Sequence, residues 1–316
     1  MLRLITAFAA LLMTLAAACA APAETILGEW TDAARAGRVV PYKIYLPNIQ
    51  SPSPVVVFSH GLGGNRDGAE YLLRHLAENG YVTVAVQHPG SDTPSVFGAA
   101  AENGGIREAT TPAVAADRFR DIPFAIDELA KMNAGDARLR GKLDMSRLGM
   151  SGHSYGAVTT LALAGQGFGP RARLSFADER IKAAIAYSPN KPRQGDPAEQ
   201  FASIRIPTFH MTGTEDKNPL DESDPVENRQ VPYRSIKNAD KYLIVFTGGD
   251  HMIFSGRRFQ GGPRPGDETF HALIQKSSLA YWDAYLKGNA EAKTYLTAGG
   301  FAKDLGSSGT FELHLR

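Results

Sequence analysis

A serine framed by two glycines carries the clearest chemical signal in this chain. Gly152-His153-Ser154-Tyr155-Gly156 matches the pattern G-x-S-x-G. In this pattern the serine lies on a sharp turn from a strand into a helix, and the flanking glycines let the two elements approach closely. The apolar segments 148–151 and 158–163 are typical of that strand and that helix. The pattern therefore predicts Ser154 as a nucleophile.

A serine hydroxyl needs a base to take its proton, and the base needs a carboxylate to orient it. After such a turn the expected chain order is serine, then Asp or Glu, then His. Asp216 and His251 each follow an apolar, strand-like segment in that order. We therefore predict His251 as the base and Asp216 as the acid, with Glu215 as the alternative acid. Asp250 is interpreted as a turn residue, since aspartate readily bonds to nearby backbone.

The negative charge that develops on an attacked carbonyl oxygen requires backbone donors. One donor is expected to be the amide of Tyr155, the residue after the nucleophile. The second should come from the glycine-rich loop 59–64, where the amide of Leu62 is the first choice and that of Gly63 the alternative. His60 in the same loop is expected to brace it by hydrogen bonding.

Short apolar strands alternate with amphipathic helices along the chain. β-Branched runs and alternating patterns indicate strands, and apolar residues at helical spacing indicate helices. Pro123 is expected to start or interrupt its helix. The predicted strands are Val39–Leu46 as an outer strand, Pro54–Ser59, Tyr81–Val86, Leu148–Ser151, Ile181–Tyr187, Ile206–Met211 and Tyr242–Phe246, and the predicted helices are Gly68–Asn79, Asp117–Met132, Tyr155–Ala164 and Glu268–Leu286.

This alternation predicts an α/β fold with a mostly parallel, doubly wound sheet and helices on both faces, in one domain. Ligands of such sheets bind beyond the carboxyl ends of the strands. The long segments 90–112, 189–203 and 254–265 have no predicted element and are expected to bind substrate. Phe97, Met252 and Phe254 are proposed for the apolar wall of the site.

The first 23 residues differ in composition from the rest. One arginine, a short apolar run and Ala21-Pro22-Ala23 predict a secretory signal peptide that is cleaved after Ala23, leaving residues 24–316 as the catalytic domain. Two alternatives are an uncleaved anchor, for which the run is short, and lipid attachment at Cys19. Since Cys19 is the single cysteine, the processed protein is expected to have no disulfide and no membrane span. A periplasmic or secreted location follows.

Lys and Arg number 34 and Asp and Glu number 33, which leaves a formal net charge of +1. This balance gives no electrostatic reason to expect nucleic acid as a partner. The acidic segment 215–227 lacks the spacing of a calcium loop, so no metal site is predicted.

Four stretches together resemble the α/β-hydrolase superfamily. Within it the chain is similar to bacterial dienelactone-hydrolase-like and platelet-activating-factor-acetylhydrolase-like serine esterases. The stretches are Trp30–Arg35 with Val40–Tyr45, Phe58–Gly64, Gly152–Ala157 and Gly248–Met252. The resemblance implies an α/β-hydrolase fold, the triad Ser154, Asp216 and His251, and the amides of Leu62 and Tyr155 as oxyanion donors. Dienelactone hydrolases themselves use a cysteine nucleophile, so simple ester hydrolysis is the expected reaction here.

The residues and the resemblance thus predict an exported serine carboxylesterase that acts on a small ester through an acyl-enzyme and needs no cofactor. Three alternatives stay open at this point: an amidase or transacylase with the same triad, a polyester or lipid-ester hydrolase, and a non-catalytic binding protein on a hydrolase scaffold. The oligomeric state is not indicated by the sequence.

Overall fold

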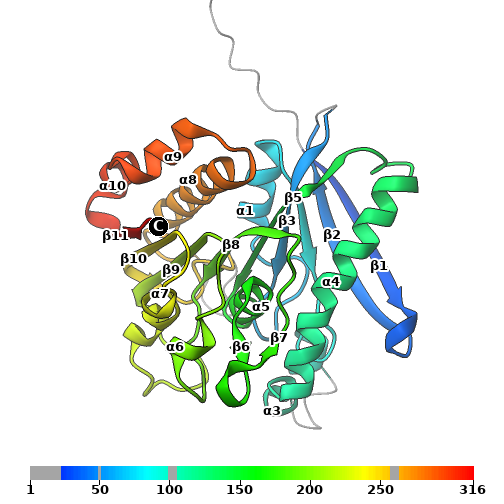
Figure 1. Cartoon of the computed structure of the whole chain (residues 1–316), viewed down its shortest axis with the longest axis horizontal. Coiled ribbons are helices and arrows are strands. Elements are labelled where there is room, and N and C mark those ends of the chain that lie inside the picture. The colour runs from blue at the N-terminus through cyan, green and yellow to red at the C-terminus, as the bar shows by residue number, and fades with distance from the viewer. Residues whose placement is uncertain (1–22, 49–50, 99–104, 257–262) are drawn as a thin grey trace, which may run out of the picture.

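The computed structural model describes residues 23–48, 51–98, 105–256 and 263–316. Strands and helices alternate along most of this range (Figure 1). The elements are β1 (Glu24–Asp32), η1 (Ala33–Arg35), β2 (Arg38–Leu46), β3 (Ser53–Ser59), α1 (Glu70–Glu78), β4 (Val82–Val86), α2 (Thr93–Phe97), α3 (Gly105–Ala109), α4 (Pro112–Gly135), β5 (Leu143–His153), α5 (Tyr155–Ala164), β6 (Gly167–Phe168), η3 (Pro170–Ala172), β7 (Leu174–Ser175), β8 (Ile181–Tyr187), α6 (Pro197–Gln200), β9 (Thr208–Glu215), η4 (Val226–Gln230), α7 (Val231–Ser235), β10 (Lys241–Asp250), α8 (Asp267–Leu286), α9 (Ala290–Thr297), α10 (Gly300–Leu305), η5 (Gly306–Ser308) and β11 (Gly309–His314).

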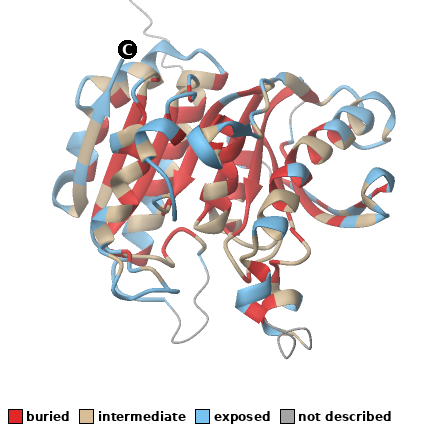
Figure 2. Cartoon of the chain, turned by 60° about the horizontal axis from the view of Figure 1, so that its bottom comes forward, coloured by how far each residue is buried: buried red, intermediate tan, exposed pale blue. Residues whose placement is uncertain are grey.

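A nine-stranded sheet in the order β1-β2-β4-β3-β5-β8-β9-β10-β11 forms the centre of the molecule. Its six strands from β4 to β10 run parallel, and β1, β2 and β11 pair antiparallel at the two sides. The central strands are apolar on both faces, and Figure 2 shows them as the most buried part of the chain. Such strands are stable only where helices cover both faces of the sheet.

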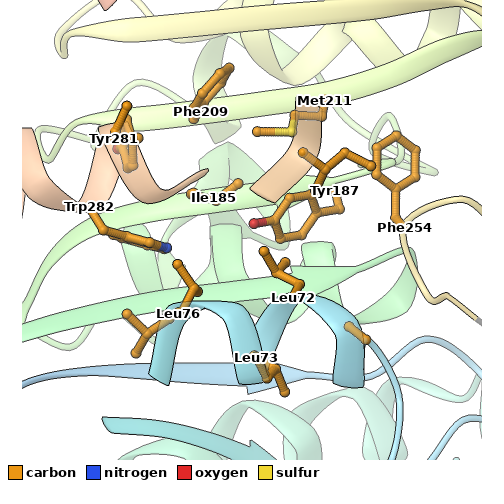
Figure 3. Close-up of a cluster of buried hydrophobic side chains, with 14 of the residues drawn as sticks. Leu72, Leu73, Leu76, Ile185, Tyr187, Phe209, Met211, Phe254, Tyr281 and Trp282 are labelled. Atoms are coloured by element: carbon orange, nitrogen blue, oxygen red, sulfur yellow. The ribbon is translucent and has the colours of Figure 1, made fainter. Parts of the chain in front are cut away.

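Successive residues of each central strand face opposite layers because side chains alternate along a strand. In β3, Val56 and Phe58 pack in the cluster that includes α1 and α8, whereas Val55 and Val57 pack in the cluster that includes α4. Figure 3 shows part of the first layer, where α1 and α8 meet β8 and β9. Two packed layers therefore hold the sheet rigid, and with it the loops at the strand ends.

The predicted fold class is confirmed, and each predicted strand and helix has a counterpart in the structure. Three expectations were wrong in detail. β1 lies outside β2 and forms the edge, so the strand expected at the outside is second. Pro123 lies inside the continuous helix α4, where Ile122 and Ala125 pack on the sheet and compensate for the missing backbone donor. The segments expected to have no element contain short helices: α2 and α3 lie in 90–112, and α6 lies in 189–203. Of the third segment, 254–265, residues 257–262 lie outside the described residues.

The predicted signal peptide, apart from Ala23, lies outside the described residues, as does Cys19. Within the described ranges, no helix has the length and apolar character that crossing a bilayer requires.

Candidate active site

Ser154 occupies the turn between β5 and α5 in a strained backbone conformation. Its φ is 56° and its ψ is −112°, a region that residues with a side chain rarely adopt. The flanking glycines make the turn possible: a Cβ on Gly156 would lie 1.8 Å from the carbonyl oxygen of Ser59, and one on Gly152 would lie 2.3 Å from the carbonyl oxygen of Gly156. The two strands β3 and β5 and the helix thus converge at a point where only glycine fits.

Two further side chains form a hydrogen-bonded chain with this serine. His251 directly follows β10, and its Nε2 lies 3.0 Å from Oγ of Ser154. Its Nδ1 lies 2.8 Å from Oδ1 of Asp216, which directly follows β9. Ser154 and His251 are partly exposed, whereas Asp216 is fully buried. The structure therefore brings together the serine, histidine and aspartate whose order the sequence predicted, with the serine partly exposed and the aspartate excluded from solvent.

The carboxylate of Asp216 is held as an anion by its neighbours. Burial alone would raise its pKa, but the hydrogen bond and charge of His251 and the charge of Arg229 hold the pKa below its usual value. Thr212 donates to Oδ2 at 2.8 Å and Ser188 donates to Oδ1 at 2.9 Å. An ionised carboxylate in this place can orient the imidazole and stabilise its protonated form.

The two other acids near this histidine do not compete for it. Glu215 is exposed, one residue before the buried carboxylate. Asp250 is the last residue of β10; it accepts a hydrogen bond from the amide of Met252, in the turn that follows, at 2.9 Å and pairs with Arg264 at 2.8 Å. Of the acids considered from the sequence, Asp216 alone has a carboxylate hydrogen-bonded to His251 within the described part of the chain.

The loop after β3 lies beside the same turn: a Cβ on Gly61 would be 3.4 Å from the Cβ of Ser154. The amide of Gly63 donates to the carbonyl oxygen of Ser91 at 2.9 Å, so it is already committed. No such bond is made, among the described residues, by the amides of Leu62 and Tyr155. Of the three amides considered from the sequence, Gly63 is therefore the one with a backbone partner in the described part of the chain, and the oxyanion role of Leu62 and Tyr155 stays a prediction.

The side chains of His60 and His153 hydrogen-bond to backbone groups of the site. Nδ1 of His60 donates to the carbonyl oxygen of Gly61 at 2.7 Å, and its Nε2 accepts from the amide of His88 at 3.0 Å. His153 is buried, and its Nε2 donates to the carbonyl oxygen of His251 at 2.8 Å. Burial lowers the pKa of His153 to about 3, so it is neutral there. Both rings brace backbone segments of the site.

Several site residues could not be recognised from the sequence. Ser188, fully buried with a φ of 50°, lies 2.9 Å from Nδ1 of His251 and also contacts Asp216. Arg229 donates to the carbonyl oxygens of Asp216 at 3.2 Å and Lys217 at 3.1 Å. A lone serine or arginine carries no motif, so the sequence held no signal that could have identified either.

The residues expected to form an apolar wall take different positions. Phe97 is 57% exposed and lies next to the loop 59–64 after β3, where a Cβ on Gly63 would be 2.5 Å from its ring. Met252 is partly buried. Phe254 is fully buried between Tyr187 and Phe246, as the cluster in Figure 3 shows in part, so it belongs to the core and the expectation for it was wrong. An apolar residue that follows a catalytic histidine can face either the site or the core, and its residue type alone does not show which.

Comparison with known proteins is consistent with this geometry. The chain is 23% identical over 269 residues to platelet-activating factor acetylhydrolase of Cavia porcellus, covering 74% of this chain and 57% of that protein. It is 25% identical over 215 residues to cutinase 2 of Thermobifida cellulosilytica, covering 66% of this chain and 64% of the cutinase. Cutinase cut1 of Thermobifida fusca is 26% identical over 215 residues, with 66% and 53% covered. Each similarity spans less than two thirds of the relative's own length.

Residues 54–219, from β3 to just beyond Asp216, match the family model of the alpha/beta hydrolase fold. This segment is more than half of the 316 residues and contains the strained serine turn. With the sheet order and the turn geometry above, the match shows that the chain belongs to the α/β-hydrolase fold family.

Proposed function

We propose that this protein is a serine carboxylic-ester hydrolase that acts through an acyl-enzyme on Ser154. The observation that carries the proposal is the continuous hydrogen-bonded chain from Oγ of the partly exposed Ser154 through His251 to buried Asp216, with distances of 3.0 Å and 2.8 Å. An isolated serine hydroxyl is a weak nucleophile at neutral pH, and an imidazole within hydrogen-bond distance activates it. An ester as substrate fits the relatives, which are named as an acetylhydrolase and as cutinases.

In the first step, Oγ of Ser154 attacks the ester carbonyl carbon while Nε2 of His251 takes the hydroxyl proton. Asp216 stabilises the imidazolium that forms, and the amides of Leu62 and Tyr155 bind the oxyanion of the tetrahedral intermediate. The intermediate collapses when the bond from the carbonyl carbon to the alkoxy oxygen breaks. His251 returns its proton to that oxygen, and the alcohol leaves.

In the second step, water attacks the acyl carbon and His251 takes a proton from it. The second tetrahedral intermediate uses the same two amides. When it collapses, Oγ of Ser154 leaves and regains the proton from His251, so the carboxylic acid is released and the enzyme is unchanged. The reaction as written consumes one ester and one water and needs no cofactor.

We also propose that residues 1–23 direct export and are removed, which would place the enzyme in the periplasm or outside the cell. The basic start, the short apolar run and the small residues before Glu24 support this proposal. The mass of the protein isolated from a producing cell tests this proposal. A mature chain that begins at Glu24 is expected, and a chain that begins at Met1 or at a lipid-modified Cys19 would contradict it.

A panel of p-nitrophenyl esters of graded acyl length, with anilides beside them, tests the activity. The esters should be hydrolysed and the anilides hydrolysed far more slowly. Ser154→Ala should lower kcat by about 10⁴-fold or more while leaving the fold intact, since the hydroxyl has one hydrogen-bond partner among the described side chains, His251. Near-normal turnover by that variant would contradict the proposal.

A further inference from the structure

Arg118, on α4, is a fully buried charged side chain that the mechanism above does not use. Its side chain has no exposed surface, yet it forms no ion pair with a carboxylate within the described residues. Burying a guanidinium without a carboxylate partner is costly, because the charge loses its hydration. Burial lowers the pKa of Arg118 to about 10, so the side chain stays cationic at neutral pH.

Arg118 contacts the two segments that hold the expected oxyanion donors and, through Ser91, the loop that follows β4. One nitrogen, Nη2, donates to the carbonyl oxygen of His60, two residues before Leu62, and to Oγ of Ser59 at 3.0 Å. Nη1 donates to Oγ of Ser91 at 2.8 Å. Ser91 in turn accepts the amide of Gly63 on its carbonyl oxygen, so both ends of the oxyanion loop are tied to one planar group.

The other side of the guanidinium contacts the nucleophile turn. Its carbon lies 4.4 Å from the ring centre of Tyr155, a cation–π contact. Nε donates to Oγ1 of Thr159 at 3.3 Å, and Thr159 donates to the carbonyl oxygen of Tyr155 at 3.2 Å. Arg118 therefore connects the loop that carries the Leu62 amide with the turn that carries the Tyr155 amide.

Ser59 also begins a buried hydrogen-bonded chain that runs away from Arg118. Ser59 accepts from Arg118, lies 2.9 Å from Nε2 of His88, and Nδ1 of His88 lies 3.0 Å from Oδ2 of Asp121. Burial lowers the pKa of His88 to about 4, so the ring is neutral and can link the serine and the carboxylate through one hydrogen bond on each ring nitrogen. Hydrogen bonds from Arg38 and His88 hold the pKa of Asp121 below its usual value against its burial, and the carboxylate also pairs with Arg35 at 2.7 Å, so two guanidinium groups already balance its charge. Although these three residues have the hydrogen-bond pattern of a serine triad, they are fully buried, and they orient the serine oxygen that accepts from Arg118.

Resting on the hydrolase function proposed above, we propose that Arg118 is a positioning residue of the oxyanion hole: it fixes the spacing of the Leu62 and Tyr155 amides and keeps a positive charge beneath them. The arrangement contributes most when negative charge appears on the substrate oxygen, in the transition state. Its loss should therefore lower kcat and leave KM nearly unchanged.

The test compares two neighbouring threonines of α5. Thr159 and Thr160 are both fully buried, and each donates to a carbonyl four residues earlier, but only Thr159 also contacts Arg118. Thr159→Val is expected to lower kcat by roughly tenfold, below the 10²–10³ that loss of a whole oxyanion donor costs, with KM within about twofold. Thr160→Val serves as the matched control and should keep kcat within about threefold of the wild type.

The affinity for a boronic acid that mimics the tetrahedral intermediate distinguishes oxyanion positioning from a purely structural role, which would leave this affinity unchanged. This affinity should fall in Thr159→Val by the same factor as kcat/KM, and fall further in Arg118→Met. Equal kcat in the two threonine variants, or a lower kcat with unchanged boronate affinity, would overturn the proposal even if Arg118→Met does not fold. Absence of ester hydrolysis by the wild type would instead contradict the proposed function, so the two failures are distinguishable.

Discussion

Replacing Asp216 by asparagine removes one charge from the site while keeping the shape of the side chain. The carboxylate Oδ1 lies 2.8 Å from Nδ1 of His251, so the charge centres of the carboxylate and a protonated imidazole are about 4 Å apart. At an effective dielectric constant of about 20, their attraction is about 4 kcal/mol. This attraction acts only when the imidazole is protonated, as in the transition state, so its loss corresponds to a fall in kcat of about 10³-fold.

The assay is the steady-state hydrolysis of a short p-nitrophenyl ester, with the melting temperature as a check on folding. Glu215→Gln is the matched control, because the neighbouring carboxylate is exposed and makes no bond to His251. It should keep wild-type kcat. A folded Asp216→Asn variant that keeps more than about a tenth of the wild-type kcat, or a fall of similar size in Glu215→Gln, would refute the reasoning.

Three further predictions concern the turn, the core and the mouth of the site. Gly156→Ala should lower the free energy of unfolding, measured in urea, by at least about 2 kcal/mol, because the new Cβ would lie 1.8 Å from the carbonyl oxygen of Ser59. The control Gly135→Ala has open space around its Cβ and should be neutral or stabilising by up to about 1 kcal/mol. Equal stabilities of the two variants would contradict this prediction. Burial lowers the pKa of His210 to about 3, and neither ring nitrogen has a hydrogen-bond partner among the described residues, so below about pH 6.5 the unfolded chain takes up a proton that the folded state does not. The free energy of unfolding of the wild type therefore decreases as the pH falls below about 6.5. His210→Leu should raise the free energy of unfolding, measured in urea and relative to the wild type, by about 2 kcal/mol more at pH 5 than at pH 8. An equal effect of the substitution at both pH values would count against a neutral buried ring. Phe97→Ala should reduce kcat/KM for long acyl chains more than for acetate, as a ring exposed beside the oxyanion loop would bind the chain; a uniform change across the ester series would place the ring outside the acyl site.

The proximity of the serine, histidine and aspartate was predictable because parallel strands end at one edge of the sheet. Each of Ser154, Asp216 and His251 follows a strand within a few residues, so the order of the strands alone brings them near each other. The choice between Asp216 and Glu215 was not predictable with the same force. Adjacent residues point to opposite sides, and the exact end of the strand decides which one is buried.

The supporting residues could not be predicted for a different reason. Arg118 is 58 residues from His60 and 41 from Thr159, and those contacts exist only once α4 has packed on the sheet. Ser188 follows β8 and likewise contacts Asp216 only because β9, the strand before the aspartate, lies next to β8 in the sheet. Periodicity and motifs describe neighbours along the chain, whereas buried hydrogen bonds join segments whose separation carries no pattern.

The edge strand and the apolar wall show the limit of judging burial from residue type. β1 has buried Ile26 and Trp30 but exposed Leu27, and its pairing with β2 depends on a turn at 36–37 that has no strong sequence signature. Phe254 and Phe97 are the same residue type near the same site, yet one is in the core and the other is exposed. The packing partner decided each case.

Covalent labelling tests the central claim most directly. The wild-type protein would be treated with a fluorophosphonate, digested, and the modified peptide identified by mass spectrometry. The predicted result is a single adduct on Ser154, lost in His251→Ala. Ser59 offers an internal comparison, since it also lies 2.9 Å from a histidine nitrogen but is fully buried. An adduct on Ser59 or any other serine, in a protein that hydrolyses esters, would contradict the account.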